Sequence, residues 1–160
     1  MRRVVFLTAL LALVTAPVLA QTNISLGGLS ADPDAPVEIT ADSLTVDQDT
    51  RSALFAGAVV IGQGDLRIAA ARVEVNYNSD TGDIARLNAS GGVTFVTATE
   101  AAESDRAIYD LTSGELTLSG NVLLTQGPNA LSADRMIVNL SAGTARMEGR
   151  VRTVFQQGGN

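Results

Sequence analysis

The chain has 160 residues; all 11 basic residues are arginine, 17 residues are acidic, and the net charge at pH 7 is −6. It contains no cysteine, histidine or tryptophan, which excludes thiol nucleophiles, Ser-His-Asp triads, imidazole proton shuttles and ordinary zinc sites. The acidic balance argues against a nucleic-acid partner, and the exclusive use of arginine fits either phosphate recognition or a biased genome composition.

The first 20 residues have the pattern of a secretory signal peptide. Arg2 and Arg3 precede a mostly apolar run, Val4–Val14, and the residues at Val18 and Ala20 indicate cleavage after Ala20. A retained membrane anchor is the alternative, but the run is shorter than the roughly 20 apolar residues that span a bilayer. Cleavage would leave 140 residues with nine arginines and a net charge of −8, which suits a single domain.

The remaining chain divides into a leader, a domain and a tail. Residues 21–35 contain Gly, Ser, Asp and Pro, and we expect a flexible tether there. The domain is expected at residues 36–156, followed by a short tail at 157–160.

An internal repeat organises the domain. Four anchor tetrapeptides, ADSL (41–44), AARV (70–73), SDRA (104–107) and ADRM (133–136), are each followed by a Gly-x-Val element, at Gly57, Gly91, Gly120 and Gly149. The second residue of each anchor precedes its glycine by 15, 20, 15 and 15 residues. This spacing predicts four copies of a 29-residue unit, with a five-residue insertion in the second copy around NSDTGD and NASGG.

Apolar and polar residues alternate within each unit, which predicts β-strands. In one type of strand the apolar series runs through the glycine, as in Phe55, Gly57 and Val59; in the other type it slips by one residue at the anchor, as between Ala70 and Val73. A slip turns the inner face over unless a bulge restores it. The anchors and glycines are therefore expected at corners, with the glycines on the inner face, where a side chain would crowd the facing arm.

These features predict an all-β fold of about eight bent antiparallel strands, two per repeat, stacked into a V-shaped β-taco or β-jelly roll. Turns containing TSGE and SAGT are expected at one end of the stack, and GQGD and QGPN at the other. A parallel β-helix is the alternative, because a solenoid coil also fits this repeat length. The terminal strands, near Val37–Val46 and Ala145–Phe155, would have no neighbour left in the chain and would be free to accept a strand from another molecule.

The segment Pro36–Tyr77 resembles the opening of the OstA-like family of periplasmic lipopolysaccharide-transport proteins. The resemblance rests on IxADSL at Ile39–Leu44, FxGxV at Phe55–Val59 and GDLRIxA at Gly64–Ala70, and it continues in weaker form to Phe155. It implies a periplasmic β-jelly-roll domain whose apolar interior shelters the acyl chains of lipid A.

The same resemblance implies head-to-tail pairing of such domains into a bridge. The partners would be an inner-membrane anchored export component and the amino-terminal domain of the outer-membrane translocon. Two features depart from the family: the chain is compact, with four repeats and a short QQGGN tail, and it carries a cleavable signal where the inner-membrane component keeps a membrane helix. The soluble bridge is therefore the favoured role.

The residues alone leave open whether the inner face is a packed core or a lipid groove. For the groove, the candidate lipid contacts are the inward positions Ile39, Leu44, Val46, Phe55, Val59, Ile68, Val73, Val75, Phe95, Tyr109, Leu118, Val122, Met136 and Val138. The candidate partner edges are Val37 and Ile39 at one end and Met147, Val151 and Phe155 at the other. No cofactor and no metal are expected.

An enzyme and a structural or carbohydrate-binding sandwich are the rival functions. The carboxylate pairs Asp80 with Asp83 and Glu100 with Glu103 fall in expected turns, where acids are usually solvated or cap the turn. With no His or Cys to act beside them, catalysis is not favoured. A sugar-binding module would offer exposed aromatic platforms, and the missing Trp argues against it.

Overall fold

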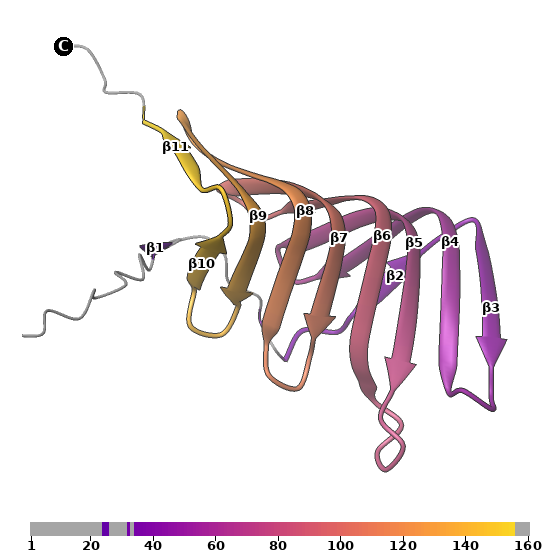
Figure 1. Cartoon of the computed structure of the whole chain (residues 1–160). Coiled ribbons are helices and arrows are strands. Elements are labelled where there is room, and N and C mark those ends of the chain that lie inside the picture. Colours follow the sequence, from indigo (N-terminus) through magenta and orange to yellow (C-terminus); the bar gives the residue numbers. More distant parts are fainter. Residues whose placement is uncertain (1–23, 26–31, 33, 156–160) are drawn as a thin grey trace, which may run out of the picture.

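The computed structural model describes residues 24–25, 32 and 34–155, and these form one 11-stranded sheet in which all strand pairs are antiparallel (Figure 1). The strands are β1 (Ile24–Ser25), β2 (Glu38–Thr40), β3 (Ser43–Asp47), β4 (Ser52–Gln63), β5 (Leu66–Tyr77), β6 (Ile84–Val96), β7 (Glu100–Asp110), β8 (Glu115–Gln126), β9 (Asn129–Asn139), β10 (Thr144–Glu148) and β11 (Arg152–Val154). Within these ranges no helix has the length and apolar composition needed to cross a membrane. The expected signal peptide, residues 1–20, lies outside the described residues.

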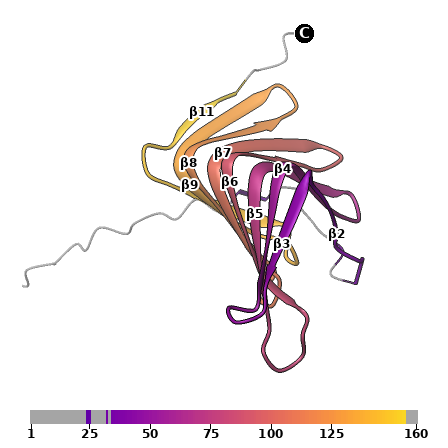
Figure 2. The same cartoon turned by 90° about the vertical axis from the view of Figure 1, so that its right-hand side faces the viewer.

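Each long strand bends at its middle, and the bends divide the sheet into two arms (Figure 2). The pairing register shifts at every bend, for example between Ala56 and Val59 of β4 and between Ser119 and Val122 of β8. At the ends of the sheet the bend interrupts the strand: β2 and β3 both pair with β4, and β10 and β11 both pair with β9. The predicted stack of about eight bent antiparallel strands is confirmed, and the parallel β-helix is wrong.

The two arms are named as they lie in Figure 2. The lower arm consists of residues 43–47, 52–56, 72–77, 84–90, 106–110, 115–119, 135–139 and 144–148. The upper arm consists of residues 38–40, 59–63, 66–70, 93–96, 100–104, 122–126, 129–133 and 152–154. Because side chains alternate between the two faces of a strand, each arm has an inner face turned toward the other arm and an outer face turned to solvent.

The corners lie at the four predicted glycines, where two consecutive residues adopt positive φ. The pairs are Gly57 with Ala58, Gly91 with Gly92, Gly120 with Asn121 and Gly149 with Arg150. A Cβ at Gly120 would lie 2.9 Å from Cγ of Asp105 on the neighbouring strand β7, and a Cβ at Gly149 would lie 2.9 Å from Cγ of Asp134 on β9. The predicted corners are therefore present, but the expectation that a side chain there would crowd the facing arm is wrong. It would crowd the neighbouring corner within the sheet, which is an aspartate opposite Gly57, Gly120 and Gly149 and Ala71 opposite Gly91.

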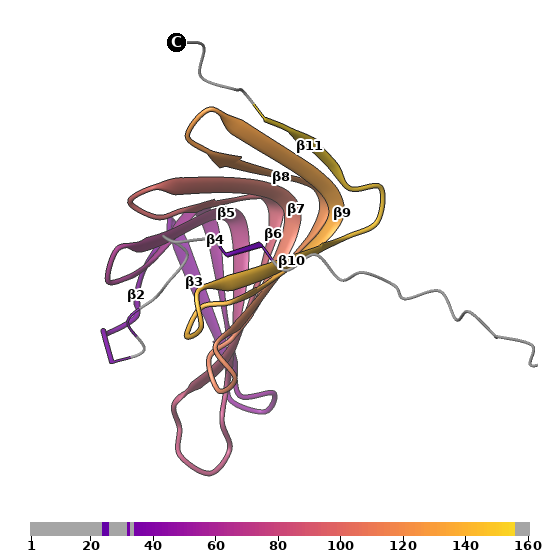
Figure 3. The ribbon, with the colours of Figure 1, turned by 90° about the vertical axis from the view of Figure 1, so that its left-hand side faces the viewer.

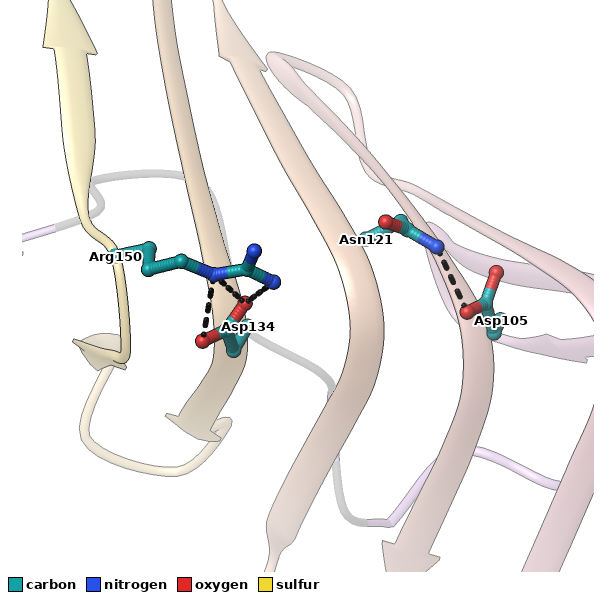
Figure 4. Close-up of polar contacts among 4 residues, drawn as sticks. All are labelled: Asp105, Asn121, Asp134 and Arg150. Atoms are coloured by element: carbon teal, nitrogen blue, oxygen red, sulfur yellow. Dashed lines mark hydrogen bonds and ion pairs between the residues drawn. The ribbon is translucent and has the colours of Figure 1, made fainter.

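Two of these aspartates are held by the residue that follows the glycine (Figure 4). The Asn121 amide donates to Asp105 Oδ2 at 3.0 Å, and the Arg150 guanidinium donates from Nε to Asp134 Oδ1 at 2.9 Å. The hydrogen bond from Arg150 holds the pKa of Asp134 below its usual value. These contacts join adjacent strands on the exposed side of the corner, so the corner is tied within the sheet and not across the arms.

The hairpin between β5 and β6 extends beyond the others at the lower end of the sheet (Figure 1). Its turn, residues 78–83, contains the NSDTGD part of the expected insertion, whereas NASGG lies within β6 and at its corner. The Asn78 side-chain oxygen accepts the backbone N–H groups of Asp80 and Thr81, as expected for an Asx turn.

Part of the leader belongs to the sheet. Ile24 and Ser25 of β1 pair with Ala145 and Thr144 of β10, so β1 lies on the lower-arm edge at the carboxy-terminal end (Figure 3). The expectation of a free tether does not hold for these two residues. The expectation that the strand Ala145–Phe155 has no neighbour left in the chain is likewise wrong at Ala145, which pairs with Ile24.

Candidate functional site

The inner faces of the two arms carry continuous rows of apolar side chains that cross the whole sheet. In the upper arm one row runs through the paired residues Ile39, Ile61, Ile68, Phe95, Ala102, Leu124 and Leu131. In the lower arm one row runs through Leu44, Phe55, Val73, Ala89, Ala107, Leu118, Met136 and Met147, and a second through Val46, Ala53, Val75, Leu87, Tyr109, Leu116, Val138 and Ala145.

All 14 predicted lipid contacts lie on this inner face. Twelve belong to the three rows, and Val59 and Val122 lie in the upper arm next to the corner, paired with Ala70 and Ala133. The register brings them together because each corner bulge restores the inward direction that the slip in the alternation would have lost. The structure thus assembles the predicted set, and the role of the set stays a prediction.

The interior between the arms is closed by packing. Val73, Val75, Phe95, Met136 and Val138 are fully buried, and residues of both arms form one hydrophobic cluster. In this structure the inner face is therefore a packed core along most of its length, and an acyl chain would have to displace contacts between the arms.

The inner face opens at the β3 end of the sheet. Leu44 and Val46 are 54% and 63% exposed, while Ile39, Val37 and Phe55 are partly buried against the core. At the opposite end Met147 packs against the core, but Val151 and Phe155 are 51% and 70% exposed. Each end of the apolar interior is thus open to a neighbouring molecule. At the β3 end the exposed residues are Leu44 and Val46, which were predicted as lipid contacts, whereas the predicted partner residues Val37 and Ile39 are partly buried. At the opposite end two predicted partner residues, Val151 and Phe155, are exposed.

Polar residues line the tips of the upper arm on its inner face. Gln63, Thr97 and Glu100 are buried, and Gln126 donates to Glu100 Oε1 at 2.7 Å. The other carboxylate oxygen of Glu100 and the hydroxyl of Thr97 have no hydrogen-bond partner among the described residues. Sequence reasoning missed this polar rim, although the alternation contained the signal: Gln63 follows Ile61 by two positions, and Glu100 precedes Ala102 by two.

Within residues 34–155 one side-chain hydrogen bond crosses the mouth between the arms. The Tyr109 hydroxyl, at the tip of the lower arm, donates to Gln63 Oε1, at the tip of the upper arm, over 2.9 Å. The amide nitrogen of Gln63 donates to the carbonyl of Ala35 in the leader at 3.3 Å. Tyr109 and Gln63 are 6% and 4% exposed, and burial raises the pKa of Tyr109. We call the hydrogen-bonded set Tyr109, Gln63 and Ala35 the latch.

A small cavity of about 170 Å³ adjoins the latch. It is lined by Gln63 and Tyr109 on one side and by Leu111, Leu140 and Ser141 from the turns at the lower end. The mouth is therefore incompletely filled beside the hydrogen bond between Tyr109 and Gln63.

The two carboxylate pairs considered for catalysis lie in different surroundings. Asp80 and Asp83 lie in the β5–β6 turn, as expected, and both are exposed. The expectation of a turn is wrong for Glu100 and Glu103, which lie in β7. Glu100 is buried on the inner face and Glu103 is exposed on the outer face. Their side chains point to opposite faces because their sequence numbers differ by an odd number and side chains alternate along a strand.

Comparisons with known proteins point to one family. A family model described as the LptA/(LptD N-terminal domain) LPS transport protein matches residues 38–144. An uncharacterized protein of Rhizobium meliloti (strain 1021) is 28% identical over 115 residues, which cover 67% of this chain and 62% of that protein. The chain thus spans less than two thirds of the length of that relative.

A solved structure has the same fold. It is LptH of Pseudomonas aeruginosa, described as the LptA-homologous periplasmic component of the conserved lipopolysaccharide transport device. The match has a TM-score of 0.71 at 16% identity and covers 79% of this chain and 99% of LptH. At this identity the likeness concerns the fold. The family model, by contrast, spans β2 to the start of β10 and so most of both arms; the chain belongs to the LptA/LptD N-terminal-domain family of LPS transport proteins.

Proposed function

We propose that this protein carries lipopolysaccharide through the periplasm with the acyl chains of lipid A held between its two arms. The observation that carries the proposal is the set of unbroken apolar rows on the inner face, which begin at the exposed β3 edge and continue to β10. With neighbouring strands about 4.8 Å apart, eight strands give an apolar interior about 34 Å long. Membership of the transport family and the LptH-like fold support the same role.

The packed interior implies that the arms part when lipid enters. An acyl chain would replace apolar contacts between the arms with apolar contacts to itself, so little hydrophobic burial is lost in the exchange. The backbone hydrogen bonds of each arm run between adjacent strands and not between arms, and they can persist while the arms separate. The latch is the polar contact that the opening would break at the tips.

We propose a carrier role in preference to an enzymatic one. Glu100 and Glu103, the pair nearest the interior, point to opposite faces of β7. The unpartnered oxygen of Glu100 and the hydroxyl of Thr97 lie on the rim, where they can hydrogen-bond the polar part of a lipid whose chains lie deeper.

Site-specific photocrosslinking in cells tests the lipid site. Adjacent residues on one strand form matched pairs: Val75 faces inward and Glu74 outward on β5, and Leu118 faces inward and Thr117 outward on β8. A photoreactive amino acid at Val75 or Leu118 should capture lipopolysaccharide, and one at Glu74 or Thr117 should not. Equal capture from both members of each pair would contradict the proposal.

We also propose head-to-tail assembly into a bridge, with the inner-membrane anchored component at one end and the amino-terminal domain of the outer-membrane translocon at the other. Among the described residues β3 pairs only with β4, and β11 only with β9, so each end of the sheet offers an open backbone edge. A strand added there would also join the apolar interiors of two domains through Leu44, Val46, Val151 and Phe155.

Sedimentation over a range of protein concentrations tests the assembly. Heterologous contacts do not close on themselves, so association should be open-ended. Val46→Glu, at a 63% exposed inward position of the edge, should weaken it, and Thr45→Glu, at the exposed outward position beside it, should weaken it less. A protein that stays monomeric at all concentrations and does not bind the translocon domain would contradict the bridge proposal.

A further inference from the structure

The outer face of the lower arm carries a row of three arginines that the lipid site does not use. The anchors AARV, SDRA and ADRM place Arg72, Arg106 and Arg135 directly after their corners. Arg72 pairs with Ser90, Ser90 with Arg106, Arg106 with Ser119, and Ser119 with Arg135. Directly paired residues share a face of the sheet, so arginine and serine alternate in one row across the lower arm, from β5 to β9.

The three guanidinium groups are free to bind a ligand. Each arginine is exposed, and within residues 34–155 none of the three takes part in a hydrogen bond or ion pair of its side chain. Other arginines of the sheet are engaged: Arg86 binds Asp110, and Arg146 binds Glu148. The carboxylates in these corners are also engaged, since Asp105 accepts a hydrogen bond from Asn121 and Asp134 accepts one from Arg150.

The spacing of the row defines two equivalent positions. Because strands lie about 4.8 Å apart, consecutive arginines are about 10 Å apart, with a serine hydroxyl midway between them. A phosphate above Ser90 would lie between Arg72 and Arg106, and a second above Ser119 would lie between Arg106 and Arg135. Guanidinium groups bind phosphate oxygens in a bidentate manner, and the hydroxyl adds a donor from below.

Four members of the row, Arg72, Ser90, Arg106 and Ser119, line a groove of about 570 Å³ on the outer face, and Arg135 lies beyond this lining. Ser90, Ser119, Asn88 and Thr45 supply hydroxyl and amide groups, and Leu54 and Ile108 supply apolar surface. Two carboxylates also line the groove: Asp47 accepts the backbone N–H groups of Asp49 and Thr50, and Glu74 accepts from Asn76. The positive charge thus lies on the corner side of a groove that combines apolar surface with hydroxyl and amide groups.

We propose that this Arg–Ser row is a second binding site, for a saccharide that carries two phosphate groups about 10 Å apart, each phosphate lying above one of the two serines. The charge of the Arg–Ser row selects the phosphate groups, and the hydroxyl and amide groups beside the row suit a saccharide. The row lies on the face opposite the apolar interior, so the site is independent of the lipid groove, and either proposal can fail without the other.

The test is an NMR titration of the mature protein with fructose 1,6-bisphosphate, which has a phosphate at each end of the sugar, and with fructose 6-phosphate, which has one. The bisphosphate should bind at least tenfold more tightly and shift the Nε–H signals of Arg72, Arg106 and Arg135. Arg106→Gln, which removes the guanidinium shared by both positions, should weaken the bisphosphate at least tenfold. Arg86→Gln, at a 53% exposed arginine on the same face, is the control and should leave the affinity unchanged.

Several outcomes would overturn the proposal. They are equal affinities for the two sugars, no binding at millimolar concentrations, or equal losses in Arg106→Gln and Arg86→Gln. Vesicles containing phosphatidylglycerol provide a further arm. Vesicle binding that depends on the three arginines, without binding of the bisphosphate, would assign the row to an anionic membrane surface instead. All variants are exposed substitutions, and an unchanged melting temperature confirms that each remains folded.

Discussion

Replacing Gly120 by alanine tests the account of the corners. Gly120 has a φ of 79°, and an added Cβ would lie 2.9 Å from Cγ of Asp105. The left-handed backbone costs a non-glycine residue about 1–2 kcal/mol. Asp105 would also have to turn away and lose its hydrogen bond from Asn121, which adds about 0.5–1 kcal/mol. We therefore expect Gly120→Ala to lower the free energy of unfolding by about 1.5–3 kcal/mol.

The measurement is urea denaturation, supported by thermal unfolding. At about 4 °C per kcal/mol for a domain of this size, the melting temperature should fall by about 6–12 °C. Gly92→Ala is the matched control, because Gly92 has a φ of 83° and no atom within 4 Å of the added Cβ, so only the backbone cost applies.

A second background separates the two contributions. In Asp105→Ala the carboxylate is removed, but Cβ of residue 105 remains 3.0 Å from the added Cβ. The cost of Gly120→Ala should therefore fall toward that of Gly92→Ala without reaching it. The reasoning is refuted if Gly120→Ala costs no more than Gly92→Ala in the native background, or if its cost is the same with and without the Asp105 carboxylate.

Three further predictions concern the latch, an ion pair and the leader. Tyr109→Phe should lower the free energy of unfolding by about 1–2 kcal/mol, because Gln63 loses its buried partner. Burial raises the pKa of Tyr109, so the stability that this tyrosine contributes is complete below its unfolded pKa near 10 and is lost as the pH rises further. In urea unfolding the free energy of unfolding of the variant should therefore fall less steeply at alkaline pH than that of the native protein. The hydrogen bond from Arg86 is the largest cause that lowers the pKa of Asp110, so Arg86→Gln should raise that pKa in a carboxyl NMR titration; an unchanged value would contradict the pairing. A chain that begins at Ala31 lacks β1 and frees its edge of β10, so it should associate at lower concentration in sedimentation; weaker association would show that β1 promotes docking.

The alternation of side chains was sufficient to predict the arms and their inner face. Strand faces follow a period of two, and the slip between Ala70 and Val73 locates a bulge without reference to any distant residue. The glycine corners were predictable for the same reason. What the glycine avoids was not, because Asp105 approaches Gly120 from another strand and becomes a neighbour only through the register.

Closure of the arms depends on contacts that the local pattern does not encode. The same apolar face suits an open groove and a packed core, and the relative position of the arms follows from the twist of the whole sheet. Tyr109 and Gln63 are 46 residues apart, and neither has a local signal for the other. The pairing of β1 with β10 joins residues from opposite ends of the chain, so the leader's composition alone indicated a tether.

The residues of the Arg–Ser row could be identified in the sequence, but their alignment could not. Each arginine was visible as the third residue of an anchor, and the serines were visible near the glycines. Their alignment required the register of five strands, because a shift of one residue in any pair would place an arginine on the opposite face.

The central claim, that lipid enters between arms that must part, can be tested by tethering the arms. The chain has no cysteine, so cysteines at Gln63 and Tyr109 can be joined across the mouth by a short bismaleimide linker that contains a reducible disulfide. The account predicts that the tethered protein takes up little fluorescent lipopolysaccharide and that a reductant restores uptake to the level of the same variant without linker. Equal uptake by the tethered and the reduced protein would contradict the claim, since the lipid would then bind without separating the arms.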